Sequence, residues 1–592
     1  MELSAVCELG KMKKETIMKN GGDMLDIFVE NPNKTGVYST VLEITVDKDF
    51  KYTGINVTEF KKEFVSRYLY KKGSSNGADY TPTSKITTSK KTFNKKILKC
   101  FKETIIRFEE YEGIDDIKKI YNCLIINSEY ILNDINANIE NSKKGYILTV
   151  VYDDKYVGDL EIFKDKVKKG AIRNYYLIDK KISKGKNKHC SICKEMKDEV
   201  FGNANIFKFY TVDKRGYVSG GFNKLDSWRN FPVCQECAVE LELGKRYLDE
   251  KLSFKFQGRD FYLIPKLLYR KKLEKILKTL SNINVDNIDS KYQNVEEMII
   301  KRLSKIEDYA TFDMLFYEVN NAALNIKLDV QEILPSRFKK IYADMEKVNL
   351  VLKTNEKSEK VKVDFSYLNR LFPRKTYNRY FLETVDIILS NKEIDYKFLI
   401  QHICNHIIEK FNEDEGKYYY FETIKSYGFL MYLRTLRVLF KERGKIDLME
   451  KLKWDIKDYD SKEEMFDSIF EENMDFFTTP DKKAVFLIGF LSQKLLNLQY
   501  IKEKRKPFIS RLRGLKLNKK DIRRLLPEIQ NKFVEYDGDY YRDIQGLASR
   551  YLIEVGENWS ISELDIPFYF AIGMNLERHI ILKTEKEEKV NE

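Results

Sequence analysis

The chain has 592 residues, of which 43% are hydrophobic and 33% are charged, and its formal net charge is +13. These figures are those of a soluble globular protein with about four domains of ordinary size. The N-terminus shows no basic leader followed by an apolar stretch, so no secretory signal is expected. The most apolar segment, 484–498, is too short to span a bilayer. We therefore expect a cytoplasmic protein with a buried helix at 484–498 and no membrane partner.

The N-terminal part of the chain, up to about residue 185, alternates between strand-like and helical segments. Strands are predicted at 38–46 and 145–152, and Asp153-Asp154-Lys155 after the second strand predicts a hairpin. Helical periodicity covers 95–109 and 114–126. The pattern predicts a mixed α/β N-terminal domain over 1–185.

A lysine-rich segment, 71–99, lies within this domain. It contains eight lysines against a single acid, Asp79, together with a run of serine, threonine and glycine. Hydroxyl and backbone donors between cations suit phosphate groups. The alternative is a flexible, solvated loop. The segment therefore predicts nucleic-acid contacts by Lys71, Lys72, Lys85, Lys90 and Lys91.

Two Cys-x-x-Cys pairs follow, Cys190/Cys193 and Cys234/Cys237. Four thiolates in two close pairs can close a tetrahedral shell around Zn²⁺ and leave no open position for water or substrate. The spacing predicts a structural zinc in a module over 186–245, and two disulfides are the alternative. The other cysteines are expected to be plain core residues: Cys7, Cys100, Cys123 and Cys404.

The zinc module also interleaves basic and aromatic residues. Such a pattern can clamp a nucleic-acid backbone and stack on bases, which predicts contacts by Lys214, Arg215 and Arg229. The aromatic residues equally suit the core of a small zinc-pinned sheet. A short basic linker, 181–188, is expected to lead into the module.

After the module, an α+β segment is expected over 246–335. Two strands are predicted around Gly258, and Asn320-Asn321 separates two apolar runs that predict a hairpin. A helical region over 336–449 and a helical bundle over 450–592 follow, with the first helices expected at 337–349, 380–389, 398–411 and 421–442. The whole chain is predicted to be an α+β multidomain protein with a mostly helical middle.

The most basic stretch, 501–532, lies in the C-terminal bundle. It holds twelve lysines and arginines against three acids, while its leucines and isoleucines still provide a core-facing side. The guanidinium group of arginine can donate two parallel hydrogen bonds to a phosphate, which favours phosphate binding over a role in solubility alone. The alternative is a plain solvated surface. We therefore predict a helical pair whose outer face meets a polyanion through Arg511, Arg513, Lys516, Lys519, Lys520, Arg523 and Arg524.

The histidines and carboxylates form no catalytic pattern. None of the four histidines is followed by Asp, and no Gly-Lys pair is followed by Ser or Thr. His402 and His406 lie four apart on a predicted helix, but Ile403 stands where a zinc protease needs Glu, so a surface or core pair is expected. Acidic clusters could hold Mg²⁺ in a carboxylate-dependent nuclease: Asp115-Asp116, Asp153-Asp154 and Glu413-Asp414-Glu415.

The zinc module resembles a known family. Its HCSIC at 189–193, its NFPVCQECAVELELGKRYL and the FYLIPKLL at 261–268 look like the zinc-binding large subunit of type I-B CRISPR Cascade. This is the Csh, or Cas-eight-b, family. The segments YTPTSKIT, PFISRLRGLKLNKKDI and PFYFAIGMNLE are similar to that pattern as well, so the resemblance covers most of the chain.

The resemblance implies a non-catalytic subunit of a CRISPR-RNA-guided surveillance complex. Such subunits lie near the 5′ handle of the guide, read a short protospacer-adjacent motif on duplex DNA, help to open it and recruit a helicase-nuclease. The implied partners are CRISPR RNA, double-stranded target DNA, the backbone and small subunits of Cascade, and the helicase-nuclease. The RNA–DNA duplex that forms when the target opens is about as stable as the DNA duplex that it replaces. Protein contacts to the nucleic-acid backbone therefore decide whether the target stays open.

The same resemblance implies that a small helical subunit can be made from an internal start. Met449, Met465 and Met474 stand at the right place to begin such a product. Two other functions are alternatives. One is a stand-alone zinc-containing nucleic-acid-binding protein or carboxylate-dependent nuclease, and the other is a zinc-stabilised scaffold that binds only protein.

Overall fold

The computed structural model describes residues 3–22, 24–73, 77–139, 144–178, 180–208, 223–267, 273–285, 295–320, 323–353, 361–413, 419–441, 444–445, 449, 451–536 and 541–582. The chain divides into two compact units. The N-terminal unit contains Glu2–Glu250 with Val319–Leu324, and the C-terminal unit contains Lys251–Glu318 with Asn325–Glu592. The predicted mixed α/β class is confirmed, whereas the domain boundaries at 185, 245, 335 and 449 stay a prediction.

A mixed sheet forms the centre of the N-terminal unit. β1 (Thr40–Val46) and β4 (Tyr146–Tyr152) pair in parallel in its middle, and both are largely buried, with Glu43 as the buried acid of β1. β2 (Tyr52–Glu59) is the more exposed antiparallel edge. The predicted hairpin is confirmed, because Asp153 and Asp154 have positive φ angles and β5 (Lys155–Tyr156) pairs back onto β4.

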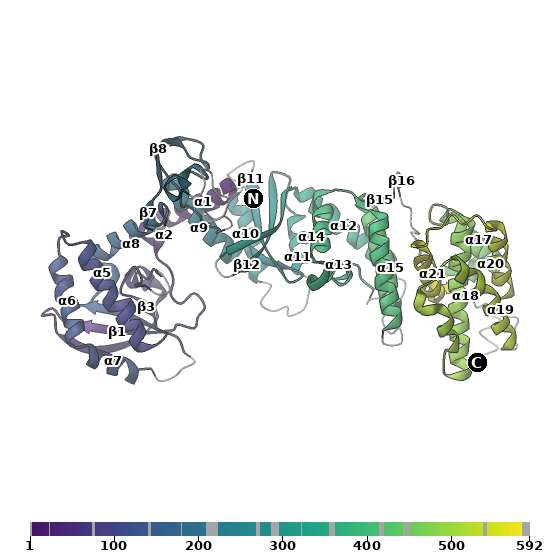
Figure 1. Ribbon diagram of the computed structural model, residues 1–592, viewed down its shortest axis with the longest axis horizontal. Coiled ribbons are helices and arrows are strands. Elements are labelled where there is room, and N and C mark those ends of the chain that lie inside the picture. The colour runs from purple at the N-terminus through teal and green to yellow at the C-terminus, as the bar shows by residue number, and fades with distance from the viewer. Residues whose placement is uncertain are drawn as a thin grey trace. The chain divides into compact units, whose positions relative to one another are not determined.

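Helices lie around this sheet (Figure 1). The helix predicted at 114–126 is confirmed as α6 (Ile114–Ile126), and the one predicted at 95–109 begins as a π-helix, Phe93–Leu98, before α5 (Lys99–Arg107). The remaining elements before the zinc module are α1 (Leu3–Lys19), α2 (Met24–Phe28), α3 (Val65–Tyr68), β3 (Ser84–Lys85), α4 (Ser89–Thr92), α7 (Ser128–Ala137), α8 (Glu161–Asn174) and β6 (Leu177–Ile178).

The basic linker expected at 181–188 is wrong. This segment forms β7 (Lys181–Ile182) and β8 (Lys184–His189), and β8 pairs with β9 (Met196–Phe201). Gly185 is buried because the Trp228 ring packs directly against it, while Lys186 extends toward solvent and the half-buried Lys184 pairs with Glu199 over 2.9 Å. α9 (Gln235–Lys251) completes the module.

The C-terminal unit begins with a four-stranded sheet in the order β10 (Ser253–Phe256), β11 (Arg259–Leu267), β12 (Ala310–Asn320) and β13 (Ala323–Ile333). The two strands predicted around Gly258 are confirmed, with positive φ angles at Gln257 and Gly258. The predicted β12–β13 hairpin is confirmed too, although Asn321 lies outside the described residues. α10 (Leu273–Val285) and α11 (Val295–Leu303) lie between β11 and β12 in the sequence.

Three of the four helices predicted after Pro335 are confirmed as α12 (Pro335–Leu352), α14 (Arg374–Ser390) and α15 (Tyr396–Asn412). The fourth prediction, 421–442, is wrong at its end. α16 (Tyr419–Thr435) stops earlier, because Arg437 takes a left-handed conformation and β15 (Leu439–Lys441) then pairs with β14 (Ile394–Asp395). The elements of this region that were not predicted are α13 (Phe365–Leu371), β14, β15 and β16 (Gly444–Lys445).

A buried cluster of charges joins α15 to α16. Glu422 lies 2.9 Å from His406 Nε2, 3.2 Å from Arg370 Nε and 3.5 Å from Lys425 Nζ. Burial alone would raise the pKa of Glu422, but the hydrogen bond with His406 and the charges of Arg370 and Lys425 outweigh it. The pKa of Glu422 is thereby lowered from 4.5 to about 2.

We expect Glu422 to make the C-terminal unit sensitive to acid. Because its pKa is depressed in the folded protein, the carboxylate stabilises the fold fully above pH 4.5, and this stabilisation is lost as the pH falls toward 2. The difference corresponds to about 3 kcal/mol of unfolding free energy. Glu422→Gln should therefore reduce stability at neutral pH and flatten the acid limb of a urea-unfolding series. A variant as acid-sensitive as the wild type would contradict this.

The predicted C-terminal bundle is confirmed. It contains α17 (Lys462–Glu472), α18 (Pro480–Glu503), α19 (Lys519–Glu535), α20 (Arg542–Val555) and α21 (Asp565–Leu576), with the 3₁₀ segment Pro507–Leu515 between α18 and α19. Segment 484–498 is buried as expected. The expectation that segment 484–498 is too short to span a bilayer is wrong, because the helix that contains the segment is longer than the segment. α18 has 24 residues and is the one described helix long and apolar enough to cross a membrane, but 67% of its apolar window is buried in the fold.

α18 and α21 touch backbone to backbone. A Cβ added to Gly489 would lie 2.2 Å from the Phe570 carbonyl oxygen, and one added to Gly573 would lie 2.0 Å from the Phe486 carbonyl oxygen. Only glycine therefore fits at either position of this crossing.

Gly489→Ala should separate these helices and lower the free energy of unfolding by about 3 kcal/mol, in the range of core overpacking. Gly546→Ala in α20 is the matched control, because nothing lies within 4 Å of the added Cβ. The control should raise stability by about 0.5–1 kcal/mol. Urea unfolding of both variants checks the prediction, and equal effects would contradict it.

The C-terminal end of the bundle contacts both the start of the bundle and the helices that precede the bundle in the sequence. β17 (Trp454–Asp455) pairs in parallel with β18 (Ile580–Ile581). α21 also packs against α15 and α16, where the Tyr396 hydroxyl donates to Asp565 over 2.8 Å and the Tyr420 hydroxyl lies 2.7 Å from His579 Nε2. The bundle is thus continuous with the helical segment that precedes it.

Candidate metal centre and nucleic-acid interface

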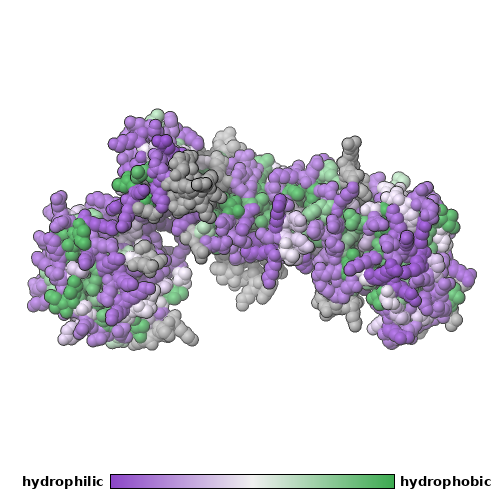
Figure 2. Space-filling model, in the orientation of Figure 1, coloured by the Kyte–Doolittle hydropathy of each residue, from purple (hydrophilic) through white to green (hydrophobic). Residues whose placement is uncertain are grey.

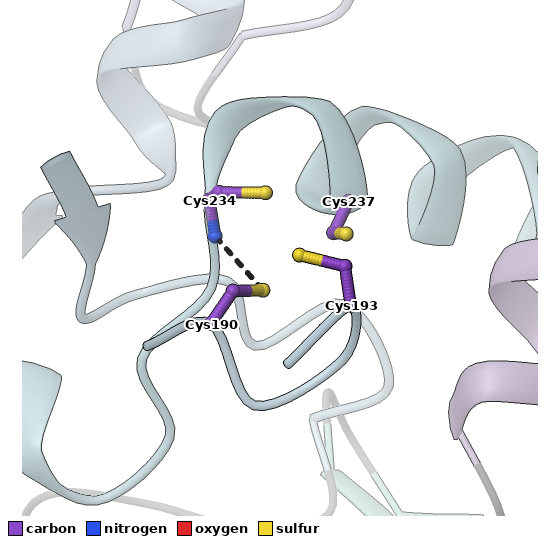
Figure 3. A group of neighbouring side chains, drawn as sticks. All are labelled: Cys190, Cys193, Cys234 and Cys237. Atoms are coloured by element: carbon purple, nitrogen blue, oxygen red, sulfur yellow. Dashed lines mark hydrogen bonds between the residues drawn. The ribbon is translucent and has the colours of Figure 1, made fainter. Parts of the chain in front are cut away.

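The four cysteines of the two Cys-x-x-Cys pairs meet at one point in the N-terminal unit. Cys190 follows β8 and Cys193 lies in the next turn, while Cys234 precedes α9 and Cys237 lies in its first turn. Figure 3 shows the four side chains pointing toward one another, and their Sγ atoms all lie within 4.8 Å of each other. The predicted convergence of the two pairs is confirmed.

The surroundings of Cys190 suit a thiolate, whereas hydrogen bonding to Cys190 raises the pKa of Cys234 and of Cys237. The backbone amides of Ile192 and Cys234 donate to Cys190 Sγ over 3.5 and 3.4 Å. Hydrogen bonding from Cys234 and then from Cys237 lowers the pKa of Cys190. Four sulfurs around one centre match the tetrahedral donor set of a thiophilic ion such as Zn²⁺, and they favour a metal over two separate disulfides. The cluster can hold such an ion with no position left open.

A fifth thiol lies beside this centre. Cys7 of α1 donates to Glu240 Oε2 over 3.3 Å, and Cys7, Cys237 and Glu240 form a second group whose ligand atoms lie within 4.8 Å of one another. Cys7 is buried as expected, but it is not a plain core residue. Glu240 could have been found, because it follows Cys237 by three residues, one turn along the same helix. No spacing in the sequence marks Cys7.

The lysine-rich segment of the N-terminal unit is folded between residues 77 and 99. The Thr81 hydroxyl donates to the Leu69 carbonyl over 2.7 Å, the Thr83 and Thr149 hydroxyls share a bond of 2.7 Å, and Asp79 accepts from Ser84 over 2.6 Å. These side chains are buried. The flexible-loop alternative is therefore wrong for this part, and these hydroxyls serve the fold instead of facing phosphates.

The lysines of this segment divide into two groups. Lys71 is only 8% exposed and pairs with Glu30 and Glu242 over 3.1 and 3.4 Å, so it links the loops after α2 and α3 to α9 and is not an exposed cation. Lys85 is half-buried, with its Nζ 4.4 Å from the Tyr38 ring centroid. The remaining predicted contacts are exposed: Lys72, Lys90 and Lys91.

In the zinc module, only one of the three predicted contacts is described. Arg229 is exposed, lies over the Trp228 ring at 5.4 Å and pairs with Asp226 over 3.5 Å. Lys214 and Arg215 lie outside the described residues. Sequence reasoning missed the exposed Lys186 and Lys188 of β8, because a lysine-rich run was interpreted as a linker.

Four of the seven cations predicted in the C-terminal bundle are held by their own fold. Arg513 pairs with Asp521 over 2.8 Å, and Arg524 lies 3.6 Å from the same carboxylate. Arg523 pairs with Glu557 over 2.9 Å, and Lys519 donates to the Trp559 carbonyl over 3.5 Å. These residues stabilise the packing of α19 and keep part of their charge satisfied.

The other three, Arg511, Lys516 and Lys520, are exposed and form no ion pair within the part of the chain that the structure describes. Sequence reasoning missed Tyr500, which is 54% exposed with Lys504 and Lys506 at 6.0 and 5.6 Å from its ring. The Phe508 amide donates to Gln499 over 3.0 Å and joins the end of α18 to the 3₁₀ segment. We call the resulting set the basic surface: Tyr500, Lys504, Lys506, Arg511, Lys516 and Lys520.

Hydrophilic side chains cover much of the bundle on the face drawn in Figure 2. Scattered hydrophobic residues interrupt them.

The acidic clusters do not assemble a carboxylate site among the described residues. Every group there that can hold a metal ion contains cysteine. Asp115 and Asp116 pair with lysines one turn along α6, at 2.9 and 3.4 Å. Asp414 and Glu415 lie outside the described residues. His406 binds Glu422 and His402 packs among aromatic rings, in agreement with their interpretation as packing residues.

Three family models match the chain. They are the N-terminal, central and C-terminal domains of CRISPR-associated protein TM1802, over residues 3–169, 187–333 and 363–588. Together they span both units and contain the four-cysteine centre and the basic surface. No curated protein matches the chain. The resemblance seen in the sequence is thereby confirmed, and the chain belongs to the CRISPR-associated TM1802 family of type I-B Cas large subunits.

Proposed function

We propose that this Cas large subunit is a non-catalytic part of a type I-B CRISPR-RNA-guided surveillance complex in antiviral defence. It binds the 5′ handle region of the CRISPR RNA, recognises the protospacer-adjacent motif on double-stranded target DNA, stabilises the opened target and recruits the helicase-nuclease. The match of three consecutive domains to one CRISPR-associated family is the observation that carries this proposal. Proteins of this kind are generally cytoplasmic components of Cascade.

Two surfaces divide the nucleic-acid contacts. The basic surface suits the displaced DNA strand, because its cations can hold phosphates while a base stacks on the Tyr500 ring, which has Lys504 and Lys506 beside it. The exposed Lys72, Lys90 and Lys91 suit the RNA handle or the motif-bearing duplex. Guide pairing supplies the sequence specificity, so these contacts need only favour the opened state.

The four-cysteine centre would hold a structural Zn²⁺. Four thiolates leave the ion no open position, so its contribution is to fold the module. The fixed elements are the β8–β9 hairpin, which carries the exposed Lys186 and Lys188, and the start of α9, which follows the 3₁₀ segment Lys224–Arg229 with the exposed Arg229.

Co-purification of the tagged full chain from a strain that co-expresses the whole CRISPR operon, followed by sequencing of the bound RNA, tests the proposal. We expect uniform guide RNA together with backbone subunits. Recovery of the chain without RNA or partners under gentle salt would favour the stand-alone alternatives. Recovery of partners without RNA would favour the protein-only scaffold.

Reversing the charge of Lys72, Lys90 and Lys91 should lower the RNA yield. The matched control reverses Lys118, Lys119 and Lys164, which already pair with acids on the surface of the same unit. Equal loss with both variants would show that overall charge, and not this surface, retains the RNA.

A further inference from the structure

Cys237 belongs to two overlapping sets of metal ligands. On one side it meets Cys190, Cys193 and Cys234, and on the other it meets Cys7 and Glu240. In both sets the ligand atoms lie within 4.8 Å of one another. The second set supplies two sulfurs and a carboxylate oxygen, a donor combination that suits a thiophilic divalent cation such as Zn²⁺.

The helix that brings Cys7 to this position is held at a fixed distance. A Cβ added to Gly10 would lie 1.7 Å from the Glu240 carbonyl oxygen, and one added to Gly244 would lie 2.0 Å from the Val6 carbonyl oxygen. α1 and α9 therefore touch backbone to backbone at two places, Gly10 with Glu240 and Val6 with Gly244. Cys7 and Cys237 are both buried, so the second set is preformed and does not depend on the chance orientation of surface side chains.

We propose that Cys7, Cys237 and Glu240 form a second metal site, which binds a thiophilic divalent cation beside the four-cysteine centre and shares the Cys237 thiolate with it. The chain supplies three ligands, and water completes the shell on the partly exposed side of Glu240. Binding releases the thiol proton of Cys7 to solvent, so no oxidant or other reactant is needed.

The second site binds its ion more weakly than the first. It has one fewer protein ligand, it must share a thiolate, and Lys14 Nζ lies 3.4 Å from Glu240 Oε1, where its positive charge competes with the metal. The two ions should therefore leave the protein in two steps as a chelator is added. The second ion also ties α1 to the zinc module, which the four-cysteine centre alone does not do.

Metal content of the full chain tests this proposal. After saturation with Zn²⁺ and removal of free ion, we expect two ions per chain in the wild type and one in Cys7→Ser, measured by elemental analysis and native mass spectrometry. Cys123→Ser, which removes a buried thiol outside both groups, should keep two. Lys14→Met should make the second ion harder to remove with a chelator.

One ion per chain in the wild type would overturn the proposal, as would two ions in Cys7→Ser. If Cys7→Ser does not fold, Glu240→Gln replaces it, because it removes the carboxylate ligand and keeps the shape of the side chain. Cobalt titration supplies an independent reading. A four-thiolate spectrum should saturate first and a weaker, oxygen-containing spectrum second, and a single phase would contradict the second site.

Discussion

Replacing Cys234 with serine should remove the metal from the four-cysteine centre and unfold the zinc module. A serine hydroxyl is a poor ligand for Zn²⁺, and binding of structural zinc supplies about 10–16 kcal/mol in small peptides at neutral pH. Much of the β8–β9 hairpin is exposed, so it has little apolar burial of its own to hold it without the ion. We expect a loss of several kcal/mol within this module.

α9 should survive this loss in part. The Tyr175 hydroxyl donates to Glu242 over 2.5 Å and Lys71 pairs with the same carboxylate, so the helix keeps an anchor on the end of α8 and on the loop after α3. Limited proteolysis of the Cys234→Ser chain should therefore cut between β8 and α9 and leave the rest of the unit protected. Cys404→Ser, in a buried position of the C-terminal unit, is the control. Unchanged metal content and cleavage in Cys234→Ser would contradict a metal centre.

Replacing Arg511, Lys516 and Lys520 together with glutamine should weaken binding of single-stranded DNA by tenfold or more at low salt, on the order expected for three lost phosphate contacts. The slope of log K against log salt should fall by about 2, because each contact to a single strand contributes about 0.7. Fluorescence anisotropy over a salt series measures both quantities.

The control for this variant removes the same charge from the same segment. Arg513, Arg523 and Arg524 pair with Asp521, Glu557 and Glu528 over 2.8, 2.9 and 3.3 Å, so their charges are already engaged. Changing all three to glutamine should alter the slope much less. Equal effects of the two triple variants would show that net charge, and not the basic surface, binds the DNA.

The four-cysteine centre could be predicted because its signal is local. Each pair supplies its two thiols from one turn, and only the meeting of two turns remains to be guessed. Cys7 could not be predicted in the same way. It joins the cluster through the packing of α1 on α9, and nothing in the spacing between Cys7 and Cys237 indicates that contact.

The fate of the basic residues could not be predicted from charge patterns. A lysine in a basic run is expected to be solvated, yet Lys71 lies between two glutamates that come from distant parts of the sequence. Arg513 is likewise held by Asp521, which its own run contains but which folding alone places at 2.8 Å. The sequence of segment 501–532 indicates that it is helical and half-buried. Which of its cations form no ion pair follows only from the contacts in the structure.

The early end of α16 has a similar cause. The periodicity of its sequence continues past Thr435, but the pairing of β15 with β14 offers the backbone another set of hydrogen bonds. That pairing joins residues more than forty positions apart, so no local window contains it.

The packing of α21 limits what an internally initiated polypeptide can be. A product that begins at Met449 keeps β17 for β18 to pair with, whereas one that begins at Met465 or Met474 leaves β18 without its strand. In every case the side of α21 that meets Tyr396 and Tyr420 in the full chain is stripped of its neighbours. A free bundle would thus enter solution with an uncovered apolar flank, and its solubility would depend on whichever molecule covers that flank in place of α15 and α16.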